Sequence, residues 1–192
     1  MTGWRRVMTS LWGFAGAERG AAAVEFALVL PIMLMLYVGS VEASALISMD
    51  RKLQSVTGAL GDLVARADKK IKAEDLEDYF KAASGIMTPY PIDTLEQVVT
   101  QVEIDDDGTA SVAWSKQYLD GDVSDSTVYE EGDSFTLPDA MMEVVGEGFV
   151  IVAEGRYSHP PLYGFAFQQT VHLYRENFFV PRFGGSIEVV DE

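Results

Sequence analysis

The side chain best placed for a specific chemical role is Glu25, because it lies inside a long apolar segment. Residues 19–42 read RGAAAVEFALVLPIMLMLYVGSVE, and no side chain from Phe26 to Val41 is charged. This run is long enough for a tilted membrane-spanning helix, which needs about 20 apolar residues. A carboxylate in such a helix costs about 2.5–3.5 kcal/mol at the centre and less toward an end. Its presence therefore indicates a function.

The two histidines are weaker candidates for chemistry. His159 precedes Pro160 and Pro161 in a predicted loop, and His172 alternates with apolar residues on a predicted strand. No metal-ligand spacing and no nucleophile motif surrounds either residue. We interpret both as ordinary structural or solvent-facing histidines.

An acidic segment around Asp105 has part of a calcium-loop pattern. Glu103, Asp105, Asp107 and Gly108 stand at its first, third, fifth and sixth positions. The twelfth position, which needs a bidentate Glu, is Trp114, and an indole cannot bind calcium. The segment therefore predicts a hairpin turn and no metal site.

Composition narrows the possible functions further. The chain has 192 residues, a net charge of -16 and no cysteine. Residues 93–192 carry 20 acidic and four basic side chains, whereas residues 1–92 are neutral. An acidic domain repels nucleic-acid phosphates and anionic lipid head groups. The lack of cysteine excludes disulfides, thiol catalysis and Cys-based zinc sites. We predict no enzyme activity, no cofactor and no small-molecule substrate.

The apolar segment resembles the N-terminal signature of a pilus protein family. Gly20, four small or apolar residues, Glu25 and the aromatic Phe26 are similar to a prepilin cleavage motif. The run from Arg19 to Glu42 resembles the TadE/TadG-like minor pilins, or pseudopilins, of the tight-adherence (Flp) pilus system. Looser similarity continues at residues 102–115, 137–141, 150–165 and 168–182. Phe26 departs from the Tyr of the major Flp pilin, which argues against a major pilin more than against processing.

This resemblance implies processing and assembly. A prepilin peptidase would cut after Gly20 and make Ala21 the new N-terminus, so that Glu25 becomes the fifth residue. Two alternatives remain, an uncleaved membrane anchor and a secretory signal peptide, although the apolar run is long for a signal peptide. The Lys and Arg residues that flank the segment are nearly balanced. The short basic tail and the resemblance place the N-terminus in the cytoplasm.

The residues after the apolar segment continue the same helix. Apolar side chains recur at alternating spacings of three and four residues, which places them on one helix face. They are Leu46, Met49, Leu53, Val56, Leu60, Leu63 and Ala67. We expect one helix over residues 21–68, about 70 Å long, with a kink at Pro31 because proline removes a backbone hydrogen bond. The stripe predicts packing on the protein's own sheet, with a coiled-coil seam to another subunit as the alternative.

The remaining chain predicts a small α+β domain. A second helix is expected over residues 73–84, with Gly85 as its stop. Alternating apolar residues predict a hairpin of strands 98–104 and 110–114. The next segment, residues 119–134, is expected to be an acidic loop. After it we expect a short helix over residues 138–145, with Thr136 or Leu137 at its entry, and then two strands over residues 149–157 and 166–175. The result is a pilin-like fold, in which a long N-terminal helix packs on an antiparallel sheet of about four strands.

The sequence therefore predicts a minor pilin or pseudopilin in three parts. Residues 1–20 are a cytoplasmic leader, 21–68 a long helix that spans the membrane over about 21–45, and 69–192 an acidic periplasmic domain. The expected partners are the inner membrane, a prepilin peptidase and other pilins or pilus-assembly proteins. The alternative is an uncleaved single-pass anchor that carries a protein-binding domain.

Overall fold

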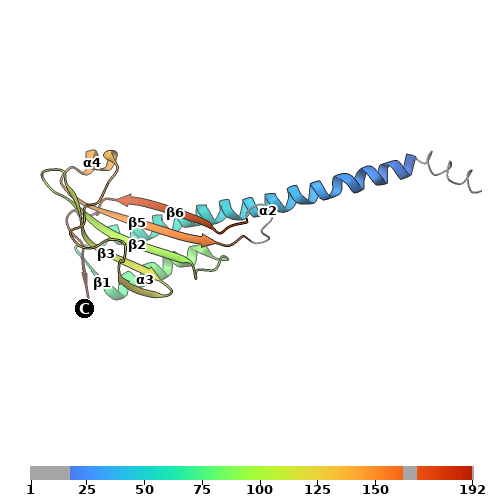
Figure 1. Ribbon diagram of the computed structural model, residues 1–192. Coiled ribbons are helices and arrows are strands. Elements are labelled where there is room, and N and C mark those ends of the chain that lie inside the picture. The colour runs from blue at the N-terminus through green and yellow to red at the C-terminus, as the bar shows by residue number, and fades with distance from the viewer. Residues whose placement is uncertain (1–17, 162–167, 192) are drawn as a thin grey trace, which may run out of the picture.

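The described part of the chain begins with a single long helix, half of which extends beyond the domain (Figure 1). The computed structural model describes residues 18–161 and 168–191. Helix α2 runs over Glu18–Ala65 and continues through Pro31 without interruption. It begins and ends three residues earlier than the predicted range of 21–68. The chain leaves the helix through Lys69, whose φ of 65° lies in the left-handed region.

The C-terminal half of α2 packs on the protein's own sheet, as the sequence stripe predicts. Met49, Leu53, Val56 and Leu60 are fully buried. Past Leu60 the buried residues of the helix are Gly61, Val64 and Ala65, whereas the predicted Leu63 is only half-buried. A helix has about 3.6 residues per turn, so a stripe with a spacing of about 3.5 drifts off the contact face.

Five antiparallel strands form the main sheet, in the order β4-β3-β2-β5-β6. The strands are β2 (Leu95–Ile104), β3 (Ala110–Leu119), β4 (Asp122–Asp125), β5 (Gly148–His159) and β6 (Val171–Phe179). The α+β class and the helix on an antiparallel sheet are confirmed, but the sheet has five strands where about four were expected. The additional strand, β4, lies in the segment predicted to be an acidic loop.

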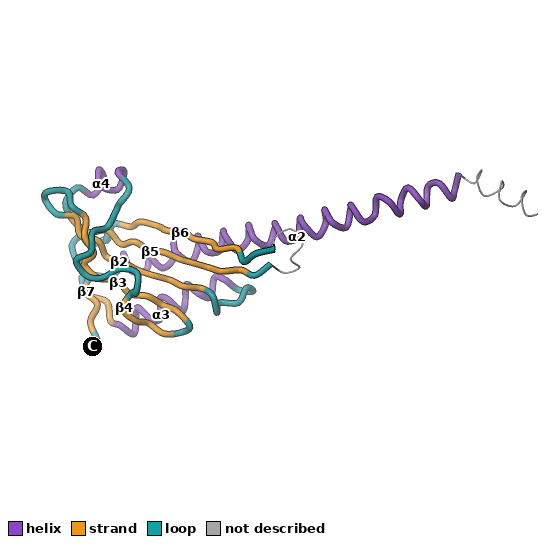
Figure 2. Tube along the Cα trace, in the orientation of Figure 1, coloured by secondary structure: helices purple, strands orange, loops and turns teal. Residues whose placement is uncertain are grey.

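Smaller elements complete the domain (Figure 2). They are β1 (Lys70–Lys72), α3 (Ala73–Ser84), the 3-10 turn η1 (Gly85–Met87), α4 (Asp139–Val145) and β7 (Glu188–Val190). β1 and β7 pair in parallel, which ties the C-terminal segment to the end of α2. The sequence did not predict either strand, because three residues are too few to show a period.

Several predicted boundaries are correct and others are wrong. Helix α3 has the predicted bounds, but Gly85 is right-handed (φ -58°) and leads into η1, so it is not a left-handed stop. Helix α4 begins at Asp139 with Pro138 as its cap, whereas the prediction started it at Pro138. Strand β6 ends at Phe179 and not at Arg175. Residues 166 and 167 of the predicted strand lie outside the described residues.

The sheet is covered on both faces. One face packs against α2 and α3 in a core that includes Leu53, Phe80 and Tyr157. The opposite face has a smaller core around Val102 and Val150, which Phe135 and the Met residues of α4 cover. Because the C-terminal half of α2 packs along this face, the N-terminal half of the helix extends beyond the sheet.

Candidate functional site

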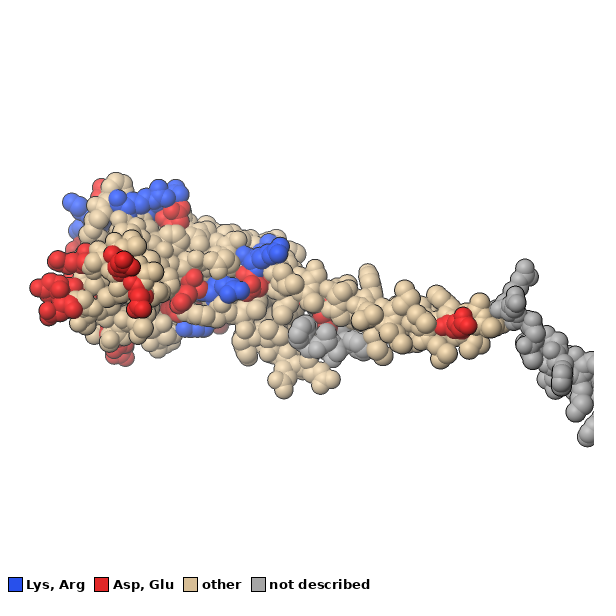
Figure 3. All heavy atoms as spheres, turned by 90° about the horizontal axis from the view of Figure 1, so that it is seen from above, with Lys and Arg blue, Asp and Glu red and all other residues tan. Residues whose placement is uncertain are grey.

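The N-terminal half of α2 is exposed and apolar. Every side chain from Gly20 to Tyr37 is exposed, including Leu28 and Leu36 at 70% each. The helix segment Gly20–Ala65 is long and apolar enough to cross a membrane. In Figure 3 this half of the molecule carries no Lys or Arg, while acidic side chains gather at the far end of the domain. Exposed apolar area on this scale indicates a surface that lipid or other protein covers.

Glu25 is the acidic residue on this exposed half. Its carboxylate makes no hydrogen bond or ion pair with any residue that the structure describes. Phe26 beside it is 61% exposed. Because the domain lies at the other end of α2, a partner for this carboxylate has to come from outside the described chain.

Gly20 and Ala21 lie in the first helical turns, since α2 begins at Glu18. A Cβ atom added at Gly20 would meet no other atom within 4 Å. The glycine is therefore not required by packing within the described chain. The predicted cleavage site, Glu25 and Pro31 are all brought onto one exposed helix, and whether the chain is cut after Gly20 and kinks at Pro31 stays a prediction.

A second carboxylate, Glu42, marks the place where the helix enters the domain. It is only 5% exposed, in contrast to Glu25, which is exposed. The sequence showed Glu42 merely as the end of the apolar run. Its burial depends on the tertiary structure, which local sequence does not reveal.

The histidines do not form a catalytic site. His159 is the last residue of β5 and pairs with Val171, so the prediction that it lies in a loop is wrong. His172 lies on β6 as predicted, with its Nδ1 atom 2.8 Å from the Ser158 hydroxyl. No carboxylate among the described residues is hydrogen-bonded to this ring, so the Ser–His pair lacks the orienting acid of a nucleophilic triad.

The Asp105 segment is a hairpin turn between β2 and β3, as predicted. The Asp105 carboxylate accepts hydrogen bonds from the backbone N–H groups of Asp107 (3.1 Å) and Thr109 (2.7 Å). Gly108 has a φ of 77°, which favours glycine. The Trp114 indole turns away and donates to the Ile187 carbonyl. No group of three potential metal ligands occurs in the described part of the chain.

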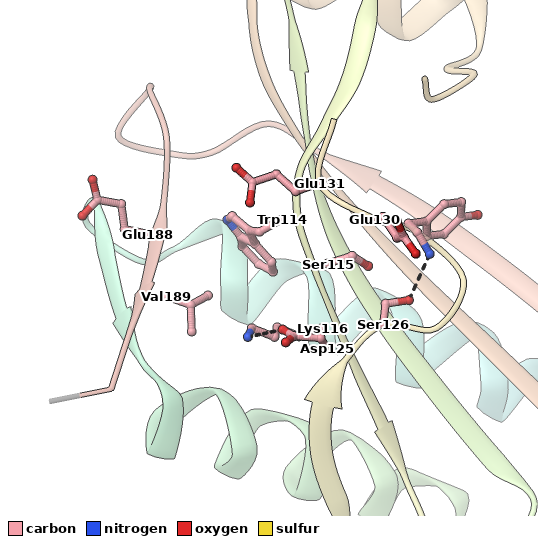
Figure 4. A pocket seen from close by; sticks show the side chains of 10 residues that line it. Trp114, Ser115, Lys116, Asp125, Ser126, Glu130, Glu131, Glu188 and Val189 are labelled. Carbon is pink, nitrogen blue, oxygen red and sulfur yellow. Dashed lines mark hydrogen bonds and ion pairs between the residues drawn. The ribbon is translucent and has the colours of Figure 1, made fainter. Parts of the chain in front are cut away.

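A surface cleft of about 510 Å³ lies between β3 and β7 (Figure 4). Trp114 projects into it, and Lys116 pairs with Asp125 at 2.6 Å. Glu130, Glu131 and Glu188 add negative charge around it. The described lining has no histidine, so the cleft lacks a conventional general base near neutral pH.

One polar cluster was not predicted from the sequence. Glu154 in the middle of β5 is 1% exposed. Its Oε1 atom accepts hydrogen bonds from the hydroxyls of Tyr174 (2.6 Å) and Tyr129 (3.2 Å). Burial and the neighbouring Glu154 carboxylate raise the pKa of Tyr129 to about 12 and the pKa of Tyr174 as well. The cluster ties β5 to edge strand β6 and to the loop after β4, which is a structural role.

Comparison with known proteins gives a match that covers most of helix α2. A family model described as TadE-like protein matches residues 20–59. No curated protein and no solved structure matches the chain. The family is pilus-associated and structural rather than enzymatic. The match begins at Gly20 and agrees with the resemblance seen in residues 19–42, so residues 20–59 of this chain match the TadE-like family of tight-adherence pilus proteins.

Proposed function

We propose that this protein is a minor pilin or pseudopilin that acts in the assembly of a tight-adherence pilus. The observation that carries the proposal is the apolar helix segment from Gly20 to Tyr37, whose side chains are all exposed and whose one carboxylate, Glu25, has no partner among the described residues. The TadE-like match at residues 20–59 supports a role among pilus components.

In this proposal the helix is first a membrane anchor. Residues 1–20 are a cytoplasmic leader, the exposed half of α2 spans the inner membrane, and residues 69–192 form the acidic domain in the periplasm. A prepilin peptidase removes the leader after Gly20. The freed amine of Ala21 then carries a positive charge at the end of the helix.

Glu25 then acts in assembly. A carboxylate is costly in a low-dielectric medium when it is unpaired and tolerable when it is paired. The Ala21 amine of a neighbouring pilin supplies the opposite charge when two apolar helices pack together. The pair fixes the register of the two helices, because a shift along the axis would leave both charges unpaired.

One structural observation favours the alternative function, an uncleaved anchor that carries a protein-binding domain. Helix α2 begins at Glu18 and runs through the Gly20–Ala21 bond, and a regular helix is not the extended form in which proteases usually hold a substrate. This alternative keeps the same membrane span and removes the role of the Ala21 amine.

The deciding experiment is the intact mass of the protein extracted from membranes of its native host. Cleavage predicts a species that begins at Ala21, and Gly20→Val should leave the full-length chain uncut. Because a side chain at Gly20 meets no other atom within 4 Å, a folding defect would not explain that result. Gly16→Val is the matched control and should be cut normally. A wild-type chain that still begins at Met1 or Thr2 would leave the uncleaved anchor as the function.

A further inference from the structure

We propose that the domain rests directly on the membrane, with one end of its sheet in the lipid head-group layer. This inference rests on the proposed membrane span of α2. The surface involved, here called the proximal rim, consists of residues 89–93 before β2 and the β3–β4 turn at residues 119–122. Its proposed ligand is a zwitterionic lipid surface.

The length of the exposed helix leaves no spacer between membrane and domain. Residues 20–41 rise about 33 Å at 1.5 Å per residue, close to the roughly 30 Å thickness of the hydrocarbon core. Yet Val38 and Gly39 are already half-buried, and Glu42 is 5% exposed. The domain therefore begins to cover α2 where the hydrocarbon core ends.

The proximal rim lies on the side of the sheet from which α2 leaves (Figure 2). The Tyr157 hydroxyl donates to the Pro91 carbonyl at 3.0 Å, and the Lys52 ammonium donates to the Ile86 carbonyl at 2.8 Å. The first bond holds the loop before β2 against β5, and the second holds η1, which leads into that loop, against α2. From Val41 to Met49 the helix rises only about 12 Å, and the head-group layer occupies about half of that distance.

Two apolar side chains of the rim are exposed without a described partner to cover them. Ile92 is 45% exposed and Leu119 is 40% exposed. Ile92 and Asp120 line the same hollow of about 210 Å³, so the loop and the turn are neighbours. Apolar side chains at the level of the head groups are stabilised by contact with lipid, as in proteins that bind a membrane interface.

The charges of the proximal rim determine whether an anionic or a zwitterionic lipid head group fits it. Asp93, Asp120 and Asp122 are exposed there, and Lys52 on α2, which donates to the nearby Ile86 carbonyl, offsets only part of their charge. Acidic side chains are repelled by anionic head groups, whose surface attracts basic residues instead. The rim therefore fits phosphatidylcholine or phosphatidylethanolamine better than an anionic lipid.

The test uses the full chain, which has no cysteine, with one chain in each phosphatidylcholine nanodisc. The single-cysteine variants Ile92→Cys and Leu119→Cys carry a polarity-sensitive fluorophore. Val144→Cys on α4 is the matched control, because Val144 is an apolar residue that is 75% exposed. We expect several-fold slower quenching by aqueous iodide at positions 92 and 119 than at 144, and quenching there by lipids that carry a nitroxide near the head group.

Equal iodide quenching at positions 92, 119 and 144 would overturn the inference. Protection that appears only with several chains in one nanodisc would also overturn it, because another subunit would then cover the rim. Leu34→Cys reports on the membrane span separately. If a label at Leu34 is quenched by iodide, the proposed span itself fails. If Leu34 is protected and the rim is not, only the present inference fails.

Discussion

At the scale of single residues, Glu25 and Glu154 show opposite ways of using a carboxylate. Glu154 is buried and held by two tyrosine hydroxyls of its own domain, so it contributes to the fold. Glu25 is exposed on an apolar helix with no described partner, so the assembly role proposed for it requires another molecule. Both glutamates have apolar neighbours in the sequence, so only their surroundings in the folded protein distinguish the two roles.

Substitution of Glu25 should impair assembly and leave processing nearly intact. Glu25→Gln keeps the shape of the side chain and removes its charge, so it should behave like Glu25→Ala. We expect the mature chain to begin at Ala21 in both variants, with fewer pili per cell and less co-purification with other pilus components. Val24→Ala, an apolar change one residue earlier, is the control. Normal pilus number in Glu25→Gln would show that the charge has no assembly role.

Tyr129 should titrate late in the folded protein. Its pKa is raised to about 12, against about 10 in an unfolded chain. Because the folded pKa is the higher one, the stability linked to this proton is complete below about pH 10 and is lost as the pH rises through about 12. Tyrosinate absorbance should therefore show a late step that Tyr129→Phe removes. If Tyr129 in the folded wild-type protein instead ionised near pH 10, the burial of its hydroxyl would be contradicted.

At the scale of elements, two glycines let α2 approach the sheet closely. A Cβ atom added at Gly61 would lie 2.3 Å from the Phe179 ring and 3.1 Å from the Ala153 Cβ atom. At Gly155 on β5 it would lie 2.8 Å from the Thr57 methyl group. At each contact one partner is a glycine, so a side chain of the other element packs directly on its backbone. Nearby, the Asn177 amide donates to the Thr57 hydroxyl at 2.6 Å.

The same substitution at two positions of α2 should have opposite effects. Gly61→Ala should lower the free energy of unfolding by about 1–3 kcal/mol, because the ring of Phe179 has to move. Gly58→Ala meets no atom within 4 Å and should raise it by up to about 1 kcal/mol through helix propensity. Chemical unfolding of both variants measures the difference. Similar free energies of unfolding for the two variants would show that the space at Gly61 can accommodate a methyl group.

At the scale of the whole molecule, charge and hydrophobicity are separated along one axis. From Gly20 to Tyr37 the exposed part of α2 carries no basic residue, and the excess acid lies in residues 93–192. Figure 3 shows acidic side chains gathered at the end farthest from the protruding helix. Such a molecule is suited to a membrane or filament core at one end and to water at the other.

This polarity predicts where the domain lies in the cell. A membrane-impermeant maleimide should label the single-cysteine variant Thr109→Cys, in the exposed β2–β3 turn, to the same extent in intact spheroplasts and after lysis. Labelling that requires lysis would place the domain in the cytoplasm and reverse the proposed orientation. Wild-type protein, which has no cysteine, is the control for unspecific labelling.

The sequence by itself determined the features whose causes are local. The apolar span, the buried stripe of α2 from Met49 to Leu60 and the bounds of α3 follow from helical periodicity. The hairpin around Asp105 follows from turn chemistry within a few residues. These patterns do not depend on where the segment lies in the folded protein, because each is set by residues that are neighbours in the chain.

Only the tertiary structure decided the features that depend on distant residues. Strands β1 and β7 pair in a two-stranded parallel sheet, with Lys70 opposite Glu188. The Glu154 carboxylate accepts hydrogen bonds from a tyrosine hydroxyl on β6 and from another in the loop after β4. The three-residue strands β1 and β7 have almost no local preference. Their partners are distant in the chain and are brought together by the packing of α2 on the main sheet, which is why local sequence could not reveal them. Strand β4 is different, because it pairs with its neighbour β3 across the Asp120-Gly121 turn, a local hairpin signal within the segment that was predicted as a loop.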